Sequence, residues 1–157
     1  MIDVGAKPET ERIAVATGEI RMAAATLRRI AAGRVPKGDV LGVARVAAIM
    51  AAKHTPDLLP LCHPIRLTGI EVDLRVDAKR KAVRIEARVS AHDRTGVEME
   101  ALTAVVAAAL CIYDMCKALD RGMTLDAIRL EEKRGGRSGL WTRSASAVSA
   151  RSGPRRR

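Results

Sequence analysis

Aromatic side chains are almost missing from this chain of 157 residues, which has no Phe, one Trp and one Tyr. Because single-stranded nucleic acids are held largely by stacking of bases on aromatic rings, this scarcity argues against that class of binding module. The core must be built from Ala, Val, Ile, Leu and Met, whose small side chains each bury little apolar surface. We therefore expect an isolated copy to be modestly stable and copies of the chain to associate.

Cysteines are also few, and Cys62, Cys111 and Cys116 form no even-numbered disulfide framework. The first residues, MIDVGAKPETER, are charged and lack the apolar stretch of a secretory signal peptide. Apolar runs look too short for a membrane span, since the longest is broken by Tyr113 and Asp114. These features favour a cytoplasmic location and no membrane partner.

Acidic residues are missing from the C-terminal part of the chain. Residues 133–157 carry eight Lys or Arg and no acid, whereas residues 1–132 carry 20 bases and 18 acids. The composition predicts a single domain over 1–140, with a polar arm over 1–11, and a basic, disordered tail over 141–157. Such a tail can contact nucleic acid or anionic surfaces without specificity, so a nucleic-acid-binding module remains an alternative function.

Period-two alternation predicts a small antiparallel sheet. Strands are expected at Thr68–Val76, Ala82–Ser90 and Thr124–Lys133, with a partly alternating edge strand at Arg12–Met22. The short polar link DAKRK makes the first two an antiparallel hairpin. Helices are expected at Ala23–Ala32, from the N-cap Asp39 until before Pro56, and at Arg94–Lys117. Three or four strands with helices on one face indicate an α+β sandwich.

The most informative segment is the apolar helix predicted over Arg94–Lys117, which carries Glu98 and Glu100 at its start and Asp114 and Lys117 near its end. Charged groups on a buried helix are costly unless they are paired or used. At about 1.5 Å per residue, Glu100 and Asp114 lie roughly 21 Å apart. If both are functional, either the site combines chains or the two ends of the helix serve different sites.

A second candidate is the segment Leu61–Cys62–His63, which lies between Pro60 and Pro64. A residue before proline is restricted to extended geometry, so the His63 imidazole is held in a fixed direction. This suits a substrate ligand or a proton-transfer group, although a loop histidine with a structural hydrogen bond fits the same pattern. No CxxC or HxxxH spacing occurs, and we predict no metal site.

Charged pairs and glycine loops leave further alternatives open. Asp114 and Lys117 share a helix face, either as a simple ion pair or as an acid and base tuned by burial. Glu98 and Glu100 either favour the helix N-terminal dipole or bind a ligand. The segments PKGD, with Lys37, and KRGGRSG place cations beside glycines, which suits phosphate binding but also a flexible basic linker.

A family resemblance is carried by three ordered blocks: PKGDVLGVARVAAIMAAKHTPDLLPLCHPIRLTGIEVDL, RTGVEMEALTAVVAAALCIYDMCKALDRGM and IRLEEKRGGRSG. Over nearly all of residues 2–139 the chain resembles the MoaC family, molybdenum cofactor biosynthesis protein C. The resemblance implies a ferredoxin-like α+β fold, an antiparallel sheet with helices packed on one face. It also implies a homohexamer, a trimer of dimers with active sites at the dimer interfaces.

The implied activity is that of a cyclic pyranopterin monophosphate synthase, a phosphorus-oxygen lyase. It converts (8S)-3′,8-cyclo-7,8-dihydroguanosine 5′-triphosphate into cyclic pyranopterin monophosphate and pyrophosphate, and the resemblance implies no cofactor. By the same resemblance, the catalytic residues are Asp114, Lys117 and Lys37. The implied substrate-binding residues are Leu61, Cys62, His63, Met99, Glu100, Glu98, Arg12 and Lys133.

Residue chemistry constrains these implied roles. A lysine exchanges protons near neutral pH only if burial or nearby cations lower its pKa, which is a condition on the implied catalytic lysines. Arg137 stands where the family commonly has a lysine in KSGGKSG, and we assign it no role. A non-catalytic nucleotide-binding protein that keeps the same pocket is the main alternative to an enzyme.

Overall fold

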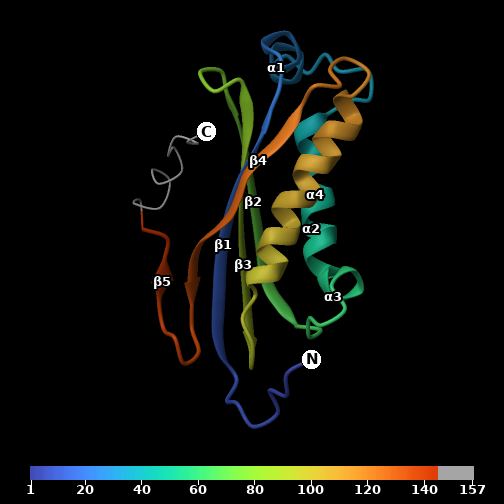
Figure 1. The fold of residues 1–157 in the computed structure, drawn as a ribbon. Coiled ribbons are helices and arrows are strands. Elements are labelled where there is room, and N and C mark those ends of the chain that lie inside the picture. The colour runs from blue at the N-terminus through green and yellow to red at the C-terminus, as the bar shows by residue number, and fades with distance from the viewer. Residues whose placement is uncertain (145–157) are drawn as a thin grey trace, which may run out of the picture.

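A computed structural model describes residues 1–144 of the chain. Within these residues a five-stranded antiparallel sheet has the order β2-β3-β1-β4-β5 (Figure 1). The strands are β1 (Thr10–Arg21), β2 (Leu67–Asp77), β3 (Ala82–Asp93), β4 (Thr124–Arg134) and β5 (Trp141–Thr142). The helices are α1 (Ala24–Ala31), α2 (Val40–Lys53), α3 (Thr55–Leu58) and α4 (Glu98–Cys116).

The connections give the predicted ferredoxin-like arrangement. β1 pairs antiparallel with both β3 and β4, and β2 forms the predicted hairpin with β3. Each of the two β-α-β units therefore places its helices on the same side of the sheet. α2 and α4 lie side by side on this face, whereas the opposite face carries no helix from the described part of the chain (Figure 1). We call the two sides the helix face and the open face.

The first strand is central and not at an edge, which corrects the sequence prediction. Its helix face is lined by small residues, with Ala14 and Ala16 fully buried. At Gly18 an added Cβ would lie 2.6 Å from Val105 Cγ1 of α4, so only glycine lets the helix cross this closely. Small residues occur here because α4 fills the space above them. Their small size makes the hydrophobic alternation of β1 weak in the sequence.

The long helix starts later than predicted, because residues 94–97 form a loop and α4 begins at Glu98. Gly96 in this loop has poor helix propensity. One side of α4 is buried, but Leu110 on its outer side is 54% exposed. By length and composition α4 meets the requirements for a membrane span, contrary to our reading of the apolar runs; half of that window is buried inside the protein, as in a core helix.

The predicted helix start at Asp39 is confirmed, since its carboxylate accepts a hydrogen bond from the Gly42 amide at 3.0 Å. The predicted tail begins too early. Trp141–Thr142 form β5, which pairs with Glu132 and Lys133 of β4. Residues 145–157 lie outside the described residues. At the other end, the polar arm is shorter than predicted because β1 starts at Thr10.

Candidate active site

One group of predicted site residues meets at the C-terminal end of α4. Asp114, in the last turn of the helix, accepts hydrogen bonds from Lys37 Nζ at 2.7 Å and from Lys117 Nζ at 2.6 Å. Lys37 also donates to the Asp114 carbonyl oxygen at 3.0 Å. Lys37 lies in the turn before α2, and the packing of α2 against α4 carries it to a partner 77 positions away. All three side chains are about half exposed.

The charges of this group set the protonation of Asp114 and Lys117. Hydrogen bonds and charge attraction from Lys117 and Lys37 lower the pKa of Asp114 to about 2. Asp114 in turn raises the pKa of Lys117 above its ordinary value. The condition of a lowered pKa is therefore not met at Lys117 in the single chain, because its nearest partner is a carboxylate and not a cation. At neutral pH Lys117 is an ammonium group that can donate a proton.

A second group meets at the N-terminal end of α4, around a pocket of about 320 Å³. The pocket is lined by Leu61, Cys62, His63, Ile65, Thr95, Gly96, Glu98, Met99 and Glu100. The fold thus brings the proline-bounded segment to the acidic start of the helix. Sequence reasoning missed Ile65, Thr95 and Gly96, although Gly96 stands two residues before a helix start. Its missing side chain leaves the space that the Glu98 carboxylate occupies.

Glu100 is the most unusual residue of this pocket, because its side chain is buried and Oε2 has no hydrogen-bond partner within residues 1–144. Burial raises the pKa of Glu100 to about 7, and the charge of Glu98 adds to this effect. Burial and the charge of Glu100 also raise the pKa of Cys62. Lys133 of β4 reaches the same place, with Nζ 3.2 Å from Glu98 Oε1. A buried carboxyl group without a partner is available to a ligand.

Glu100→Gln is expected to stabilise the protein by about 2 kcal/mol near pH 8 and to have little effect near pH 5. The folded-state pKa of Glu100 lies above its unfolded value, so its contribution to stability is present at low pH and is lost as the pH rises through about 7. Urea unfolding at several pH values in this range measures how steeply the free energy of unfolding changes with pH. The exposed Glu86→Gln is the control and should keep the wild-type slope; an unchanged slope in Glu100→Gln would contradict the prediction.

Arg12 belongs to the same end of the molecule and is buried at the start of β1. Its guanidinium donates to the carbonyl oxygens of Asp93 at 3.1 Å and Arg94 at 3.2 Å. It also lies against Gly135 and Gly136, which have φ angles of 98° and 69°. A side chain at either glycine would collide with Arg12 or the neighbouring strand. The KRGGRSG segment therefore forms a defined turn packed against Arg12, not a flexible linker.

The two groups occupy opposite ends of one helix. Glu100 and Asp114 are 14 positions apart on α4, or roughly 21 Å along a straight helix. One copy of the chain therefore carries two separate clusters, one cationic around an ionised carboxylate and one with a buried acid in a pocket. Within residues 1–144, no three His, Cys, Asp or Glu side chains are grouped so that they could hold a metal ion.

Comparisons with known proteins place this geometry in context. The model of the MoaC family matches residues 1–136. The chain is 60% identical over 143 residues to a cyclic pyranopterin monophosphate synthase from Thermomicrobium roseum, covering 91% of this chain and 86% of the relative. Proteins of the same name from Roseiflexus sp. and Rhodospirillum rubrum are 63% and 58% identical, covering 88% and 92% of this chain and 88% and 87% of theirs.

Proposed function

The chain belongs to the MoaC family and is a cyclic pyranopterin monophosphate synthase of molybdenum cofactor biosynthesis, and we propose how its residues perform the reaction. The proposed substrate is (8S)-3′,8-cyclo-7,8-dihydroguanosine 5′-triphosphate, and the proposed products are cyclic pyranopterin monophosphate and pyrophosphate. This makes the enzyme a phosphorus-oxygen lyase. A substrate hydroxyl gives up its proton to water and forms a bond to the α-phosphorus. The bond between the α-phosphorus and the oxygen that bridges to the β-phosphorus breaks, and pyrophosphate leaves with that oxygen and the electron pair.

The observation that carries the proposal is the Lys37–Asp114–Lys117 cluster, where two ammonium groups contact one carboxylate. Rebuilding the purine-derived ring requires protons to be given to ring atoms and taken from them. Asp114 keeps Lys117 protonated, so Lys117 is the proton donor in our proposal, and Lys37 is the second proton carrier. Once Lys117 has given up its proton, the carboxylate still holds its amine in position for the return step.

The N-terminal cluster is proposed to bind the substrate. Arg12, His63 and Lys133 balance the triphosphate charge and stabilise the leaving pyrophosphate. Lys133 Nζ lies 3.2 Å from Glu98 Oε1, so the substrate phosphates compete with this carboxylate for the ammonium group. Glu100, whose pKa is raised to about 7 by burial, offers a protonated carboxyl group to a substrate acceptor at lower pH.

The remaining pocket residues shape the cavity around the substrate. Leu61 and Met99 are exposed apolar side chains at its mouth, with exposed fractions of 70% and 40%. They can cover the ring system of a bound substrate, and the burial of their apolar surface would stabilise the complex. Cys62 lines the pocket beside them, and burial favours its neutral thiol. We propose that these three residues bind substrate and carry no covalent step.

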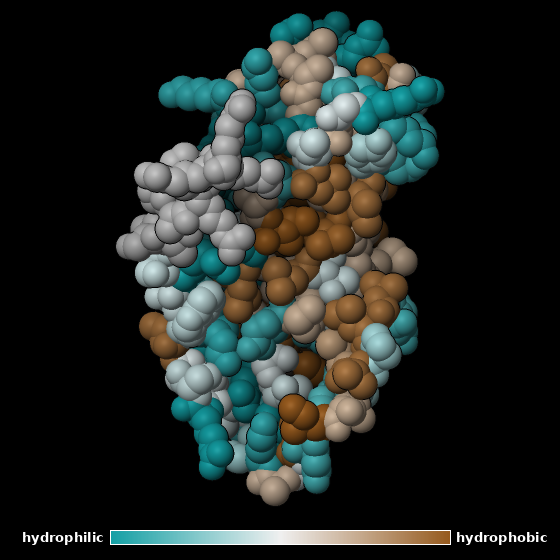
Figure 2. Space-filling view, in the orientation of Figure 1, coloured by the Kyte–Doolittle hydropathy of each residue, from teal (hydrophilic) through white to brown (hydrophobic). Residues whose placement is uncertain are grey.

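Complete sites are proposed to form between two copies of the chain. An apolar surface extends over α2 and α4 (Figure 2), where Val43, Val46, Met50 and Leu110 are 47–57% exposed. A two-fold axis across this surface would place the C-terminal end of α4 in one copy beside the N-terminal end in the other. We propose that three such dimers form a cytoplasmic homohexamer, and that no nucleic acid or membrane takes part.

Turnover by the purified wild-type chain tests the proposed function. Incubation with the cyclic guanosine triphosphate derivative should yield cyclic pyranopterin monophosphate and pyrophosphate, measured by chromatography and by a coupled phosphate assay. The same sample without substrate gives the background. Binding without product would instead support a nucleotide-binding protein that lacks catalysis, and would overturn the proposal.

A further inference from the structure

β4 contains a bulge at Glu131. Ala16 of β1 pairs with Leu130, but the next residue back, Val15, pairs with Glu132. Glu131 is therefore the extra residue, and two residues of β4 oppose one of β1 at this point. Such a bulge changes the direction of every side chain that follows it.

The bulge decides where Lys133 points. Leu130 lies opposite the buried Ala16 and so belongs to the helix face. Without an extra residue, strict alternation would turn Lys133, three positions later, to the open face. With the bulge, Lys133 pairs with the buried Ala14 and returns to the helix face. Only from that face does it reach Glu98 of α4, which lines the pocket.

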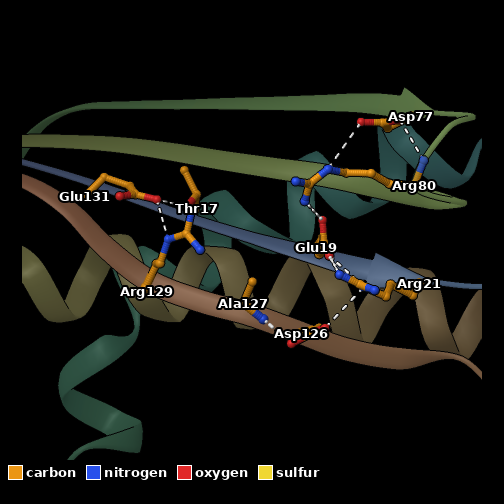
Figure 3. Close-up of polar contacts among 9 residues, drawn as sticks. All are labelled: Thr17, Glu19, Arg21, Asp77, Arg80, Asp126, Ala127, Arg129 and Glu131. Carbon is orange, nitrogen blue, oxygen red and sulfur yellow. Dashed lines mark hydrogen bonds and ion pairs between the residues drawn. The ribbon is translucent and has the colours of Figure 1, made fainter. Parts of the chain in front are cut away.

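The Glu131 side chain is held from the open face of the sheet. Its Oε1 accepts hydrogen bonds from Thr17 Oγ1 at 2.7 Å and from Arg129 Nε at 2.6 Å (Figure 3). Burial alone would raise the pKa of Glu131, but these hydrogen bonds and the nearby arginine charges hold it below its ordinary value. The carboxylate is ionised at neutral pH and ties the bulge to both β1 and β4.

Arg143, directly after β5, holds the backbone of the bulge. Its amide donates to the Glu131 carbonyl oxygen at 2.8 Å, and its Nε donates to the Leu130 carbonyl oxygen at 2.7 Å. The same Nε lies 3.9 Å from Glu131 Oε2. Arg143 therefore donates hydrogen bonds to the carbonyl oxygens of Leu130 and Glu131, at the point where the pairing of β4 with β1 is interrupted.

We propose that Glu131 and Arg143 are positioning residues for Lys133. Glu131 fixes the bulge from the open face, and Arg143 fixes it from beyond the predicted end of the domain at residue 140. Together they direct Lys133 toward the substrate phosphates on the helix face. This inference depends on the substrate-binding role proposed for Lys133. It assigns a function to the open face, where the site residues do not lie, and to residue 143, which the sequence placed in a disordered tail.

A double-mutant cycle tests the inference in the full-length chain. Glu131→Ala and Arg143→Ala should each raise the KM for substrate about tenfold, with kcat changed less than about twofold, because Lys133 acts in binding. In a Lys133→Ala background neither substitution should weaken binding further. The matched control is Glu132→Gln on the adjacent position, which should leave KM unchanged. Glu131→Gln, which keeps the acceptor oxygen for Thr17, should lose less than Glu131→Ala.

Calorimetric binding of guanosine triphosphate to the same variants separates the two levels of the proposal. A wild type that binds this probe but makes no product would refute the function, while the binding cycle still decides the role of Glu131 and Arg143. Losses that add to that of Lys133→Ala, or wild-type affinity in both single variants, would overturn the positioning role. So would a wild type whose affinity does not depend on Lys133. Equal melting temperatures and oligomer sizes exclude a general loss of folding.

Discussion

Lys117→Ala is expected to lower product formation at least about a hundredfold while leaving the fold and the assembly intact, because proton transfer by a positioned side chain contributes on that scale. Lys117 Nζ lies 2.6 Å from Asp114, which raises the pKa of Lys117 and keeps it charged at neutral pH. Removing the ammonium group removes the proton donor and leaves the Asp114 carboxylate with Lys37 alone. Steady-state product formation, with circular dichroism and light scattering on the same samples, measures the effect.

The control for this variant distinguishes the loss of Lys117 itself from the loss of any one positive charge. Lys79→Ala removes an exposed lysine from the β2–β3 turn and should retain full activity. Because the pKa of Asp114 is lowered to about 2, protonation of this carboxylate should not limit the rate at any pH where the protein is usually assayed. A fully active Lys117→Ala protein would refute the assignment of the proton donor, and with it the proposed role of the Lys37–Asp114–Lys117 cluster.

Mixing two inactive variants is expected to restore about a quarter of the wild-type activity. Lys117→Ala damages the C-terminal end of α4 and His63→Ala damages the pocket at the N-terminal end. If each site combines one end from each copy, a mixed dimer has one site with both defects and one with neither. Random association makes half of the dimers mixed, and half of their sites active. Co-expression of the two variants, followed by the turnover assay, measures the recovery.

The matched control is a mixture of Lys117→Ala with Lys37→Ala. Both substitutions affect the same end of α4, so every site in a mixed dimer carries one of them and no activity should return. Recovery in this control, or none in the Lys117→Ala and His63→Ala mixture, would contradict shared sites. In that case the roughly 21 Å between the two ends of the helix would mean two independent sites in each copy.

The open-face inference also changes what a truncation should do. The composition of the chain predicts full activity after deletion beyond Gly139, since only a solvated tail is lost. The structure predicts a loss in substrate affinity, because that deletion removes β5 and Arg143 and with them two hydrogen bonds to the bulge. A deletion beyond Ser144 keeps both and is the corresponding control. Together the two lengths locate the end of the functional domain.

Local patterns were sufficient for most of the elements. The alternation of β2 and β3, the short turn between them and the Asp39 cap are all properties of neighbouring residues, and each is confirmed. The same holds for the charges at both ends of the apolar helix. The start of α4 was predicted too early, because the poor helix propensity of Gly96, two residues before Glu98, was not taken into account.

The sequence by itself determined which chemical groups this protein has and how far apart α4 holds them, since the length of a helix depends only on its number of residues. Only the tertiary structure decided which groups meet. It placed β1 at the centre of the sheet, brought Lys37 to Asp114 across 77 positions, and turned Lys133 to the helix face through one extra residue in β4. Strand order and bulges depend on pairing between distant segments. The alternation within one strand does not specify which strand pairs with it or in which register.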